Sequence, residues 1–253
     1  HAFTLSGRSY VTITGFTITR TEDTGFHVKS SSNNVTISDS VVNYANSRGI
    51  YVSGSSNVVI ASNVISFNND HGIYLTSGSQ GCTIQDNESF RNARLSSRAA
   101  NGLNISGSTG NLIQRNRFHD NQDTGMMYQS SGNNNISLQN LSWNNGDHGY
   151  DHLNSSGNLN VGNIAWHNYK DGISIEGTSP SNKVFDCILV DNGLTTNEFD
   201  LWVDSTSKTG FVSDYNIIWN SITNTTNPIK YVSTQYATIA AFTAASGQDA
   251  HSI

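Results

Sequence analysis

The sequence predicts an all-β protein that folds as a right-handed, single-stranded parallel β-helix, a solenoid of about 8–9 rungs with roughly 23 residues each. Three observations support this fold class. A glycine recurs at nearly constant spacing, short segments of alternating apolar and polar residues follow each copy, and a column of asparagines keeps the same register. Stacked rungs of this kind bury one continuous, narrow core.

The recurring glycine opens the first strand of each rung. Successive copies are separated by 24, 23, 30, 23, 24 and 23 residues, at Gly25, Gly49, Gly72, Gly102, Gly125, Gly149 and Gly172. The 30-residue interval contains the segment RNARLSSRAANG. Because insertions in repeat proteins form loops on one face, we expect a protruding inter-rung loop within residues 80–100.

The strand after each glycine alternates between the two faces of its sheet. Residues one and three positions after the glycine are apolar in most rungs, as in Ile50 and Val52, and are expected to point inward. The residue two positions after the glycine is expected to point outward. These outward residues are His27, Tyr51, Tyr74, Asn104, Met127, Asp151 and Ser174.

Five asparagines fall at matching positions of later strands, namely Asn63, Asn87, Asn116, Asn140 and Asn163. Stacked amides can hydrogen-bond from rung to rung, as they do in other stacked-strand structures. An asparagine-rich β-sandwich would not require this register. Seven N-x-S/T matches, including Asn87, Asn104 and Asn224, are interpreted as a by-product of the same composition.

Residues 1–253 are predicted to form one β-helix domain. A solenoid needs capped ends to stay soluble. Residues 230–253 are expected to form a partial C-terminal cap, and the chain is expected to be truncated at both ends. Natural ends covered by loops or by a partner are the alternative.

Composition excludes several classes of protein. The net charge is −6 without a run of like charges, so a nucleic-acid partner is not expected. No apolar run approaches the roughly 18 residues of a membrane span. Cys82 and Cys187 are predicted to be separate buried thiols, with a single disulfide as the alternative.

The segment NNGDHGYDHL, residues 144–153, concentrates ionisable groups in a chain with 13% charged residues. Asp147 lies two residues before its glycine and Asp123 occupies the same position one rung earlier, so their backbones should stack about 4.8 Å apart. Asp151 faces outward beside them. Three clustered carboxylates require a proton or a cation. We therefore predict a Ca²⁺ site formed by Asp123, Asp147 and Asp151, with His148 as a further ligand.

Turn capping is the simpler alternative for each single aspartate, because Asp and Asn commonly cap backbone groups in turns. Asp23 and Asp70 occupy the same column without another carboxylate beside them. Capping does not explain Asp151, which lies in mid-strand. His152 falls in the inward column next to Tyr128, and is predicted to be a hydrogen-bonded core histidine.

The cleft is expected on the outward face of residues 100–176, with the loop that holds Arg94 and Arg98 as its wall. Met127 and Asp171 complete the predicted substrate-binding set. The expected partner is an acidic polysaccharide.

The segment NGDHGYD, residues 145–151, resembles the NGDDGFD calcium motif of the family 9 polysaccharide lyases, which are pectate-lyase-like β-helix enzymes. The resemblance implies that Asp123, Asp147 and Asp151 bind Ca²⁺, with His148 in place of one aspartate. It also implies that a lysine acts as general base on the next rung, where this chain has Ser174. Lys170 or His148 is the expected substitute. The implied reaction is Ca²⁺-dependent β-elimination on a uronate-containing polysaccharide.

Three other functions share this fold. A C5-epimerase of the alginate type is loosely suggested by Tyr150, Asp151, His152 and Asp171. A glycoside hydrolase would need two carboxylates, such as Asp147 and Asp151. The third is a carbohydrate-binding or structural module without catalysis. For every alternative we expect a secreted, bacterial protein that is monomeric and has no membrane partner.

Overall fold

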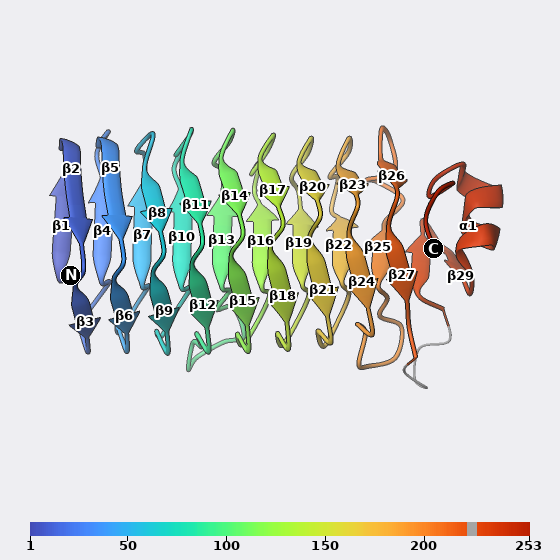
Figure 1. The fold of residues 1–253 in the computed structure, drawn as a ribbon, viewed down its shortest axis with the longest axis horizontal. Helices are drawn as coiled ribbons and strands as arrows, with labels where there is room; N and C mark the ends of the chain where they lie inside the picture. Colours follow the sequence, from blue (N-terminus) through green and yellow to red (C-terminus); the bar gives the residue numbers. More distant parts are fainter. Residues whose placement is uncertain (222–226) are drawn as a thin grey trace.

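The computed structural model describes residues 1–221 and 227–253 and shows a parallel β-helix (Figure 1). Each turn contributes one strand to each of three sheets that run along the axis. Within the described residues, one sheet (sheet A) contains 11 strands and the other two (sheets B and C) contain 9 each, which confirms the predicted fold class. No helix within the described residues is long and apolar enough to cross a lipid bilayer.

Sheet A has 11 strands: β1 (Phe3–Ser6), β4 (Phe26–Lys29), β7 (Ile50–Ser53), β10 (Ile73–Thr76), β13 (Leu103–Ser106), β16 (Met126–Gln129), β19 (Tyr150–Leu153), β22 (Ile173–Glu176), β25 (Leu201–Val203), β28 (Ile229–Tyr231) and β29 (Thr234–Tyr236). All neighbours are parallel except β28 and β29.

Sheet B comprises β2 (Ser9–Thr14), β5 (Asn33–Ser38), β8 (Val59–Ala61), β11 (Thr83–Gln85), β14 (Leu112–Gln114), β17 (Ile136–Leu138), β20 (Leu159–Val161), β23 (Lys183–Phe185) and β26 (Val212–Asp214). Sheet C comprises β3 (Thr17–Thr19), β6 (Val41–Asn43), β9 (Val64–Ser66), β12 (Glu88–Phe90), β15 (Arg117–His119), β18 (Leu141–Trp143), β21 (Ile164–Trp166), β24 (Ile188–Val190) and β27 (Ile217–Trp219).

The core is a column of inward side chains from the three sheets. Ile50, Val52, Ile73 and Leu75 are fully buried and pair in register between β7 and β10. The predicted inward positions are therefore confirmed. Cys82 and Cys187 are buried and free, as predicted.

The recurring glycine is required by the close approach of successive turns. A Cβ atom on Gly149 would lie 2.7 Å from the Gly172 carbonyl oxygen and 2.8 Å from Asn168 Nδ2. Any side chain would push these turns apart, so the glycine column sets the rung spacing.

The predicted asparagine ladder is present and fully buried. Asn63, Asn87, Asn116 and Asn140 each donate Nδ2–H to Oδ1 of the asparagine one turn further on, at 2.9–3.1 Å. The seven N-x-S/T matches include the buried residues Asn87 and Asn104, while Asn224 lies outside the described residues. Asn87 belongs to the ladder, so the repeated asparagines account for part of the N-x-S/T matches.

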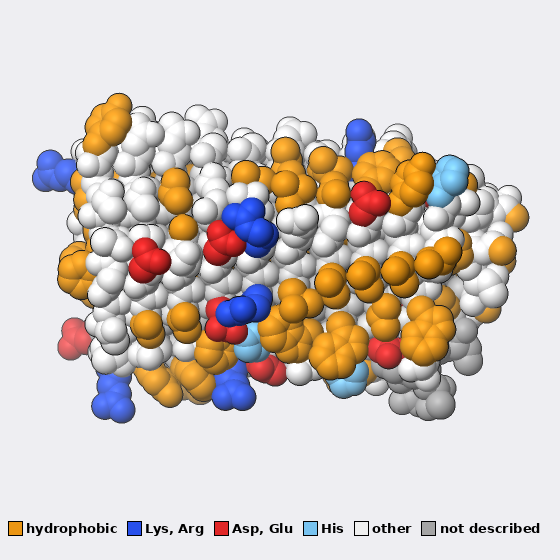
Figure 2. All heavy atoms as spheres, in the orientation of Figure 1, with side chains coloured by type: hydrophobic (Ala, Val, Ile, Leu, Met, Phe, Trp, Pro, Cys, Tyr) orange, Lys and Arg blue, Asp and Glu red, His pale blue; other side chains and the backbone are white. Residues whose placement is uncertain are grey.

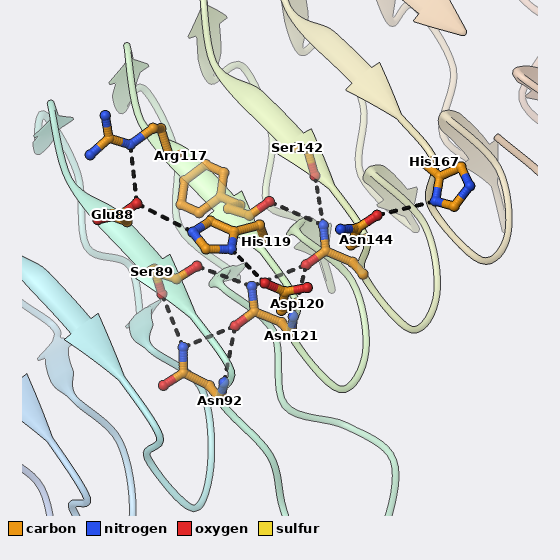
Figure 3. A network of polar contacts seen from close by, with 12 residues as sticks. Glu88, Ser89, Asn92, Arg117, His119, Asp120, Asn121, Ser142, Asn144 and His167 are labelled. Atoms are coloured by element: carbon orange, nitrogen blue, oxygen red, sulfur yellow. Dashed lines mark hydrogen bonds and ion pairs between the residues drawn. The ribbon is translucent and has the colours of Figure 1, made fainter. Parts of the chain in front are cut away.

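A second ladder, which the sequence analysis missed, lies in the turns that precede sheet A. It runs through Asn68, Asn92, Asn121, Asn145, Asn168 and Asn192 with Nδ2–Oδ1 distances of 2.8–3.1 Å. Figure 3 shows its Asn92–Asn121 step, with Ser89 beside Asn92. This ladder fixes the turns that hold the candidate site.

Asp200 takes the next position of the second ladder. Asn192 donates its backbone N–H and its Nδ2–H to Asp200 Oδ1, both at 2.9 Å. Burial raises the pKa of Asp200 to about 7, and the hydrogen bonds from Asn192 and Asn220 only partly offset this. In the folded chain the neutral carboxyl is therefore the favoured form below a pH of about 7.

Replacing Asp200 with Asn should remove a pH dependence of stability. The folded-state pKa of Asp200 lies above the unfolded value of about 4. Below a pH of about 4 the carboxyl is neutral in both states, so its full contribution to the free energy of unfolding is present. It is lost as pH rises to about 7. Asp200→Asn should raise the free energy of unfolding above this window by about 2–4 kcal/mol. Urea unfolding at several pH values tests this, and parallel pH profiles for the two proteins would contradict it.

Figure 2 views the molecule from the side of sheets B and C, with sheet A behind. Apolar side chains form rows along the axis, because equivalent residues of successive turns pair in register, such as Leu141 with Ile164. Charged side chains on this face form exposed pairs, including Arg115 with Asp86 at 2.8 Å. Such exposed pairs contribute little to stability.

The C-terminal end is covered by β29 and by helix α1 (Ile239–Ser246). Thr238 caps the helix by accepting a hydrogen bond from the Ala241 amide, and Gly247 ends it with a left-handed backbone conformation. Phe242 is buried against Tyr231 and Tyr236. The helix thus covers the last turn of the core.

Candidate functional site

The candidate site lies on sheet A between two long connections. Residues 91–102 join β12 to β13 and residues 191–200 join β24 to β25, whereas the connections between them are short (Figure 1). A cleft of about 260 Å³ lies beside the second of these connections. Its lining residues are His148, Lys170, Glu176, Asn197, Glu198, Trp202 and Lys230.

The turns beside the cleft stack in the predicted register. The Asp147 amide donates to the Asp123 carbonyl at 3.1 Å, and the Lys170 amide donates to the Asp147 carbonyl at 3.0 Å. Asn145 of the second ladder lies two residues before Asp147, so the ladder fixes this turn. Asp123, Asp147 and Lys170 therefore form one column at the edge of sheet A.

Two cations already contact the acidic pair in this column. The Arg98 guanidinium lies 3.5 Å from Asp123 Oδ1 and 3.2 Å from Asp147 Oδ2. Lys170 Nζ lies 2.8 Å from Asp147 Oδ1. Burial, with the charge of Asp147, raises the pKa of Asp123 to about 6. Arg98 and Lys170 therefore occupy the place that the sequence analysis gave to Ca²⁺.

The predicted Ca²⁺ ligand set fits this structure poorly. Ca²⁺ is bound by six to eight oxygen atoms. Arg98 contacts both Asp123 and Asp147. Among the described residues, Asp147 Oδ1 and Asp151 Oδ1 are both buried without a hydrogen bond, but Asp147 Oδ1 is ion-paired with Lys170, whereas Asp151 has no ion pair with a lysine or arginine. Asp123 and Asp147 are thus paired with protein cations, and His148 lies between them and Asp151, with its Nε2 3.8 Å from Asp147 Oδ1.

Asp151 is the most unusual carboxylate of the site. It faces outward on β19, as predicted, but is only 4% exposed. Its Oδ1 is buried and has no hydrogen-bond partner in the described part of the chain. Burial raises the pKa of Asp151 to about 8, although the charge of His148 acts in the opposite direction. An isolated carboxylate is costly in such a place, so Asp151 favours a proton or a cation.

His148 lies next to Asp151 and is 2% exposed. Its Nδ1 is 3.2 Å from the Asp171 amide nitrogen and 3.2 Å from Asp171 Oδ2. The neutral Nε2–H tautomer accepts from the amide at Nδ1, whereas the neutral Nδ1–H tautomer and the imidazolium donate to the carboxylate. Burial lowers the pKa of His148, but Asp171, Asp151 and Asp147 more than reverse this and raise it to about 10. Without a ligand the ring is therefore cationic at neutral pH.

Lys170 and Ser174, two of the predicted catalytic residues, have different surroundings. Burial lowers the pKa of Lys170, but its ion pair with Asp147 more than reverses this, so the amine is held as a cation. Ser174 is fully buried and its hydroxyl donates to Glu176 Oε1 at 3.4 Å. Neither residue has the free basic group that a general base needs.

The predicted substrate-binding residues do not all meet in the cleft. Arg98 lies beside the acidic pair, but Arg94 binds Asp70 at 2.6 Å and lines a different pocket. Asp171 is fully buried and accepts a hydrogen bond from the Phe199 amide, so it lies under the cleft residues and does not line the cleft. Met127 points outward on β16 next to Asp151 and remains a candidate substrate contact.

Five residues that line the cleft were missed from the sequence: Glu176, Asn197, Glu198, Trp202 and Lys230. Register could have found Trp202 and Lys230, which continue the outward column after Ser174. Glu198 belongs to the long connection, where the Gly193 amide donates to the Lys170 carbonyl at 2.8 Å. Lys230 Nζ lies 5.0 Å from the Trp202 ring, and burial raises the pKa of Glu198 to about 7.

The set that suggested a C5-epimerase is not assembled on this face. His152 is fully buried, packs against Tyr128 with the ring centroids 4.9 Å apart, and lies 3.1 Å from Asn160 through Nε2, as predicted for a core histidine. Tyr150 is also buried and donates to the Asn140 carbonyl at 2.8 Å. Asp151 alone of this group reaches the outward face.

A second cluster of ionisable groups surrounds His119 on sheet C (Figure 3). Its Nδ1 is 2.8 Å from Asp120, and its Nε2 is 3.3 Å from Glu88. The ring is also stacked between Phe90 and Trp143. Both ring nitrogens are therefore occupied, and the carboxylates lie on opposite sides of the ring rather than around one point.

Comparisons with known proteins agree with this architecture. One family model, described as "Periplasmic copper-binding protein (NosD)", matches residues 2–145, and another, described as "Right handed beta helix region", matches residues 85–241. No curated protein sequence matches the chain.

Solved structures with the same fold include enzymes that act on polysaccharides. The A-module of mannuronan C-5 epimerase AlgE6 from Azotobacter vinelandii has a TM-score of 0.78 and 16% identity, over 92% of this chain and 68% of that chain. The periplasmic alginate epimerase AlgG has a TM-score of 0.62 and 17% identity, over 83% of this chain and 59% of that chain. Pectate lyase Pel9A has a TM-score of 0.61 and 15% identity, over 90% and 69%.

The fold is therefore that of the pectate-lyase-like β-helix proteins. Each family model covers more than half of the chain, and the chain belongs to these overlapping families of right-handed β-helix proteins. At the identities found, the solved structures establish the fold alone.

Proposed function

We propose that the chain is a polysaccharide lyase that binds a uronate-containing polysaccharide in the sheet A cleft and cleaves it by β-elimination. The observation that supports this most is the composition of the cleft. It combines two lysines and a tryptophan with two glutamates beside the long loop at residues 191–200, so it offers cations and an apolar ring to an anionic sugar. The epimerases and the pectate lyase with this fold are named for alginate, mannuronan or pectate, which also favours such a substrate.

The substrate would be held by charge and by stacking. Lys170 and Lys230 line the cleft and can each pair with a uronate carboxylate. Trp202 offers an apolar ring for a sugar face, and its Nε1 has no hydrogen-bond partner among the described residues. That nitrogen is buried, so the indole would bind a sugar by ring contact.

Glu198 is the group best suited to remove the proton. It lines the cleft beside Lys170 and belongs to the long loop at residues 191–200. Its pKa of about 7, raised by burial, is close to the working pH that favours a general base. The carboxylate would take the C5 proton, the electron pair would form the C4–C5 double bond, and the C4–oxygen bond would break. The leaving oxygen would receive a proton from water or from a cationic side chain of the cleft.

In this mechanism Lys170 is a binding and charge-stabilising residue rather than the base. Its ammonium group would stabilise the negative charge that develops on the uronate carboxylate after proton removal. Arg98 would hold Asp147 in place, and Ser174 would orient Glu176. No step of this mechanism depends on Ca²⁺ at Asp123 and Asp147.

Product analysis on a panel of polyuronates tests this function. A lyase produces unsaturated chain ends that absorb in the near ultraviolet, and we expect this signal with at least one polyuronate. Reducing ends without the absorbance would identify a hydrolase, and altered sugar composition without cleavage would identify an epimerase. Binding without any product would identify a carbohydrate-binding module. Each of these three results would overturn the lyase proposal.

We also propose an extracellular or periplasmic location. AlgG is named as periplasmic, as is the family that matches residues 2–145. A polymeric substrate would be met outside the cytoplasm, which is consistent with this location.

A further inference from the structure

Three side chains beside the cleft converge on one point. His148, Asp151 and Glu176 each offer a ligand atom, and these atoms all lie within 4.8 Å of one another. His148 Nδ1 faces the Asp171 backbone, while Nε2 lies 4.0 Å from Glu176 Oε1 on the other side of the ring. Nε2 also lies 3.8 Å from Asp147 Oδ1. When Nε2 binds an ion, the ring proton is on Nδ1, which can donate to Asp171 Oδ2 at 3.2 Å.

The scaffold holds these three side chains firmly. Asp151 and Glu176 project from β19 and β22, which pair directly through Asp151–Ser174 and Leu153–Glu176. The Ser174 hydroxyl donates to Glu176 Oε1 at 3.4 Å. His148 belongs to the turn fixed by Asn145 and Asn168 of the second ladder. Contacts of this kind orient the ligands of bound metals.

An independent observation indicates that a ligand is needed here. Asp151 belongs to this group, and its Oδ1 is buried without a hydrogen-bond partner within the described ranges. Buried polar atoms are normally satisfied, and each exception requires an explanation. A cation between Asp151, Glu176 and His148 would satisfy this oxygen.

We propose that His148, Asp151 and Glu176 bind a divalent transition-metal ion of the Zn²⁺ type. One imidazole and two carboxylates form a mixed nitrogen and oxygen set, and three protein ligands with an open position are typical of Zn²⁺ sites that act on substrates. Imidazole suits Zn²⁺ and its neighbours in the first transition row, whereas Ca²⁺ prefers oxygen ligands throughout. Asp147 Oδ1 lies 3.8 Å from His148 Nε2 but is ion-paired with Lys170, and Asp123 is paired with Arg98, so neither belongs to the proposed ligand set.

The open position would face the substrate cleft. His148 and Glu176 both line the cleft, next to Lys170 and Trp202. A bound ion could therefore meet an anionic group of a ligand from that side. The metal site does not depend on the lyase proposal, because its test measures binding alone.

Calorimetric titration of the metal-stripped full chain with Zn²⁺ tests the proposal, and Co²⁺ gives a second readout by visible absorption. We expect one ion per chain in the wild-type protein. Asp151→Asn and Glu176→Gln should each weaken Zn²⁺ binding by about 100-fold or more, since losing a direct ligand costs at least as much as losing an outer-sphere partner. Both variants nearly preserve side-chain shape, and circular dichroism checks that they fold.

His71→Gln is the matched control. His71 lies in the equivalent DHG turn, but the strand that follows offers Tyr74 and Thr76 in place of Asp151 and Leu153. This variant should bind Zn²⁺ like the wild type. Undetectable Zn²⁺ and Co²⁺ binding by the wild type would overturn the proposal, as would unchanged affinity in Asp151→Asn. Preferential Ca²⁺ binding that Asp123→Asn abolishes would also overturn it, and would restore the ligand set implied by the lyase motif.

Discussion

Replacing Glu198 with Gln should lower kcat on the polyuronate substrate by about 100- to 10,000-fold, which is the usual contribution of a general base. The amide cannot accept the C5 proton, whereas its size and position should preserve substrate binding. KM should therefore change little. Initial rates of near-ultraviolet absorbance measure both constants.

Glu88→Gln is the matched control for this substitution. Glu88 lies on sheet C, where it contacts Arg117 and His119 away from the cleft. Its variant should retain wild-type rates. Turnover near the wild-type level in Glu198→Gln would remove Glu198 from the mechanism, and Asp151 would become the remaining acidic group beside the cleft with a strongly raised pKa.

Replacing Asn140 with Ala should be the most destabilising of the changes considered. Asn140 Nδ2 donates to the Ile113 carbonyl and to Asn163 Oδ1, and its Oδ1 accepts from the backbone and side chain of Asn116. The alanine variant leaves several buried groups unpaired and opens a small cavity. We expect a loss of roughly 3–5 kcal/mol in the free energy of unfolding.

Asn69→Ala provides the comparison for this stability measurement. Asn69 donates to Asn46 in an exposed pair, outside the buried ladders. Its substitution should cost less than about 1 kcal/mol. Urea unfolding of both variants measures the difference, and equal losses would contradict a special role for the buried ladder.

The fold was predictable because it repeats. Gly149 and the other glycines of its column mark close approaches between turns, and the inward residues of each following strand alternate regularly. The same register placed Asp123 below Asp147 and turned Asp151 outward. The second ladder has the same spacing, with Asn121 and Asn145 separated like Asn116 and Asn140, so the same repeat contains the signal for it.

The parts of the site that could not be predicted lie outside the repeat. Arg98 and Glu198 belong to long connections, whose side chains have no equivalent in neighbouring rungs. Register shows that Asp147 and Lys170 are stacked, but not that their side chains form an ion pair. Whether a carboxylate forms an ion pair depends on side-chain conformation, and the spacing of residues in the sequence does not determine that conformation. For this reason the predicted Ca²⁺ set and the structure disagree.

A crystal structure of Glu198→Gln with a uronate oligosaccharide tests the central claim most directly. We predict that the sugar lies in the sheet A cleft, with one ring on Trp202 and a carboxylate paired with Lys170 or Lys230. Sugar bound only to another surface, such as the aromatic side chains of sheet C around Trp143 and Trp166, would contradict the proposed active site.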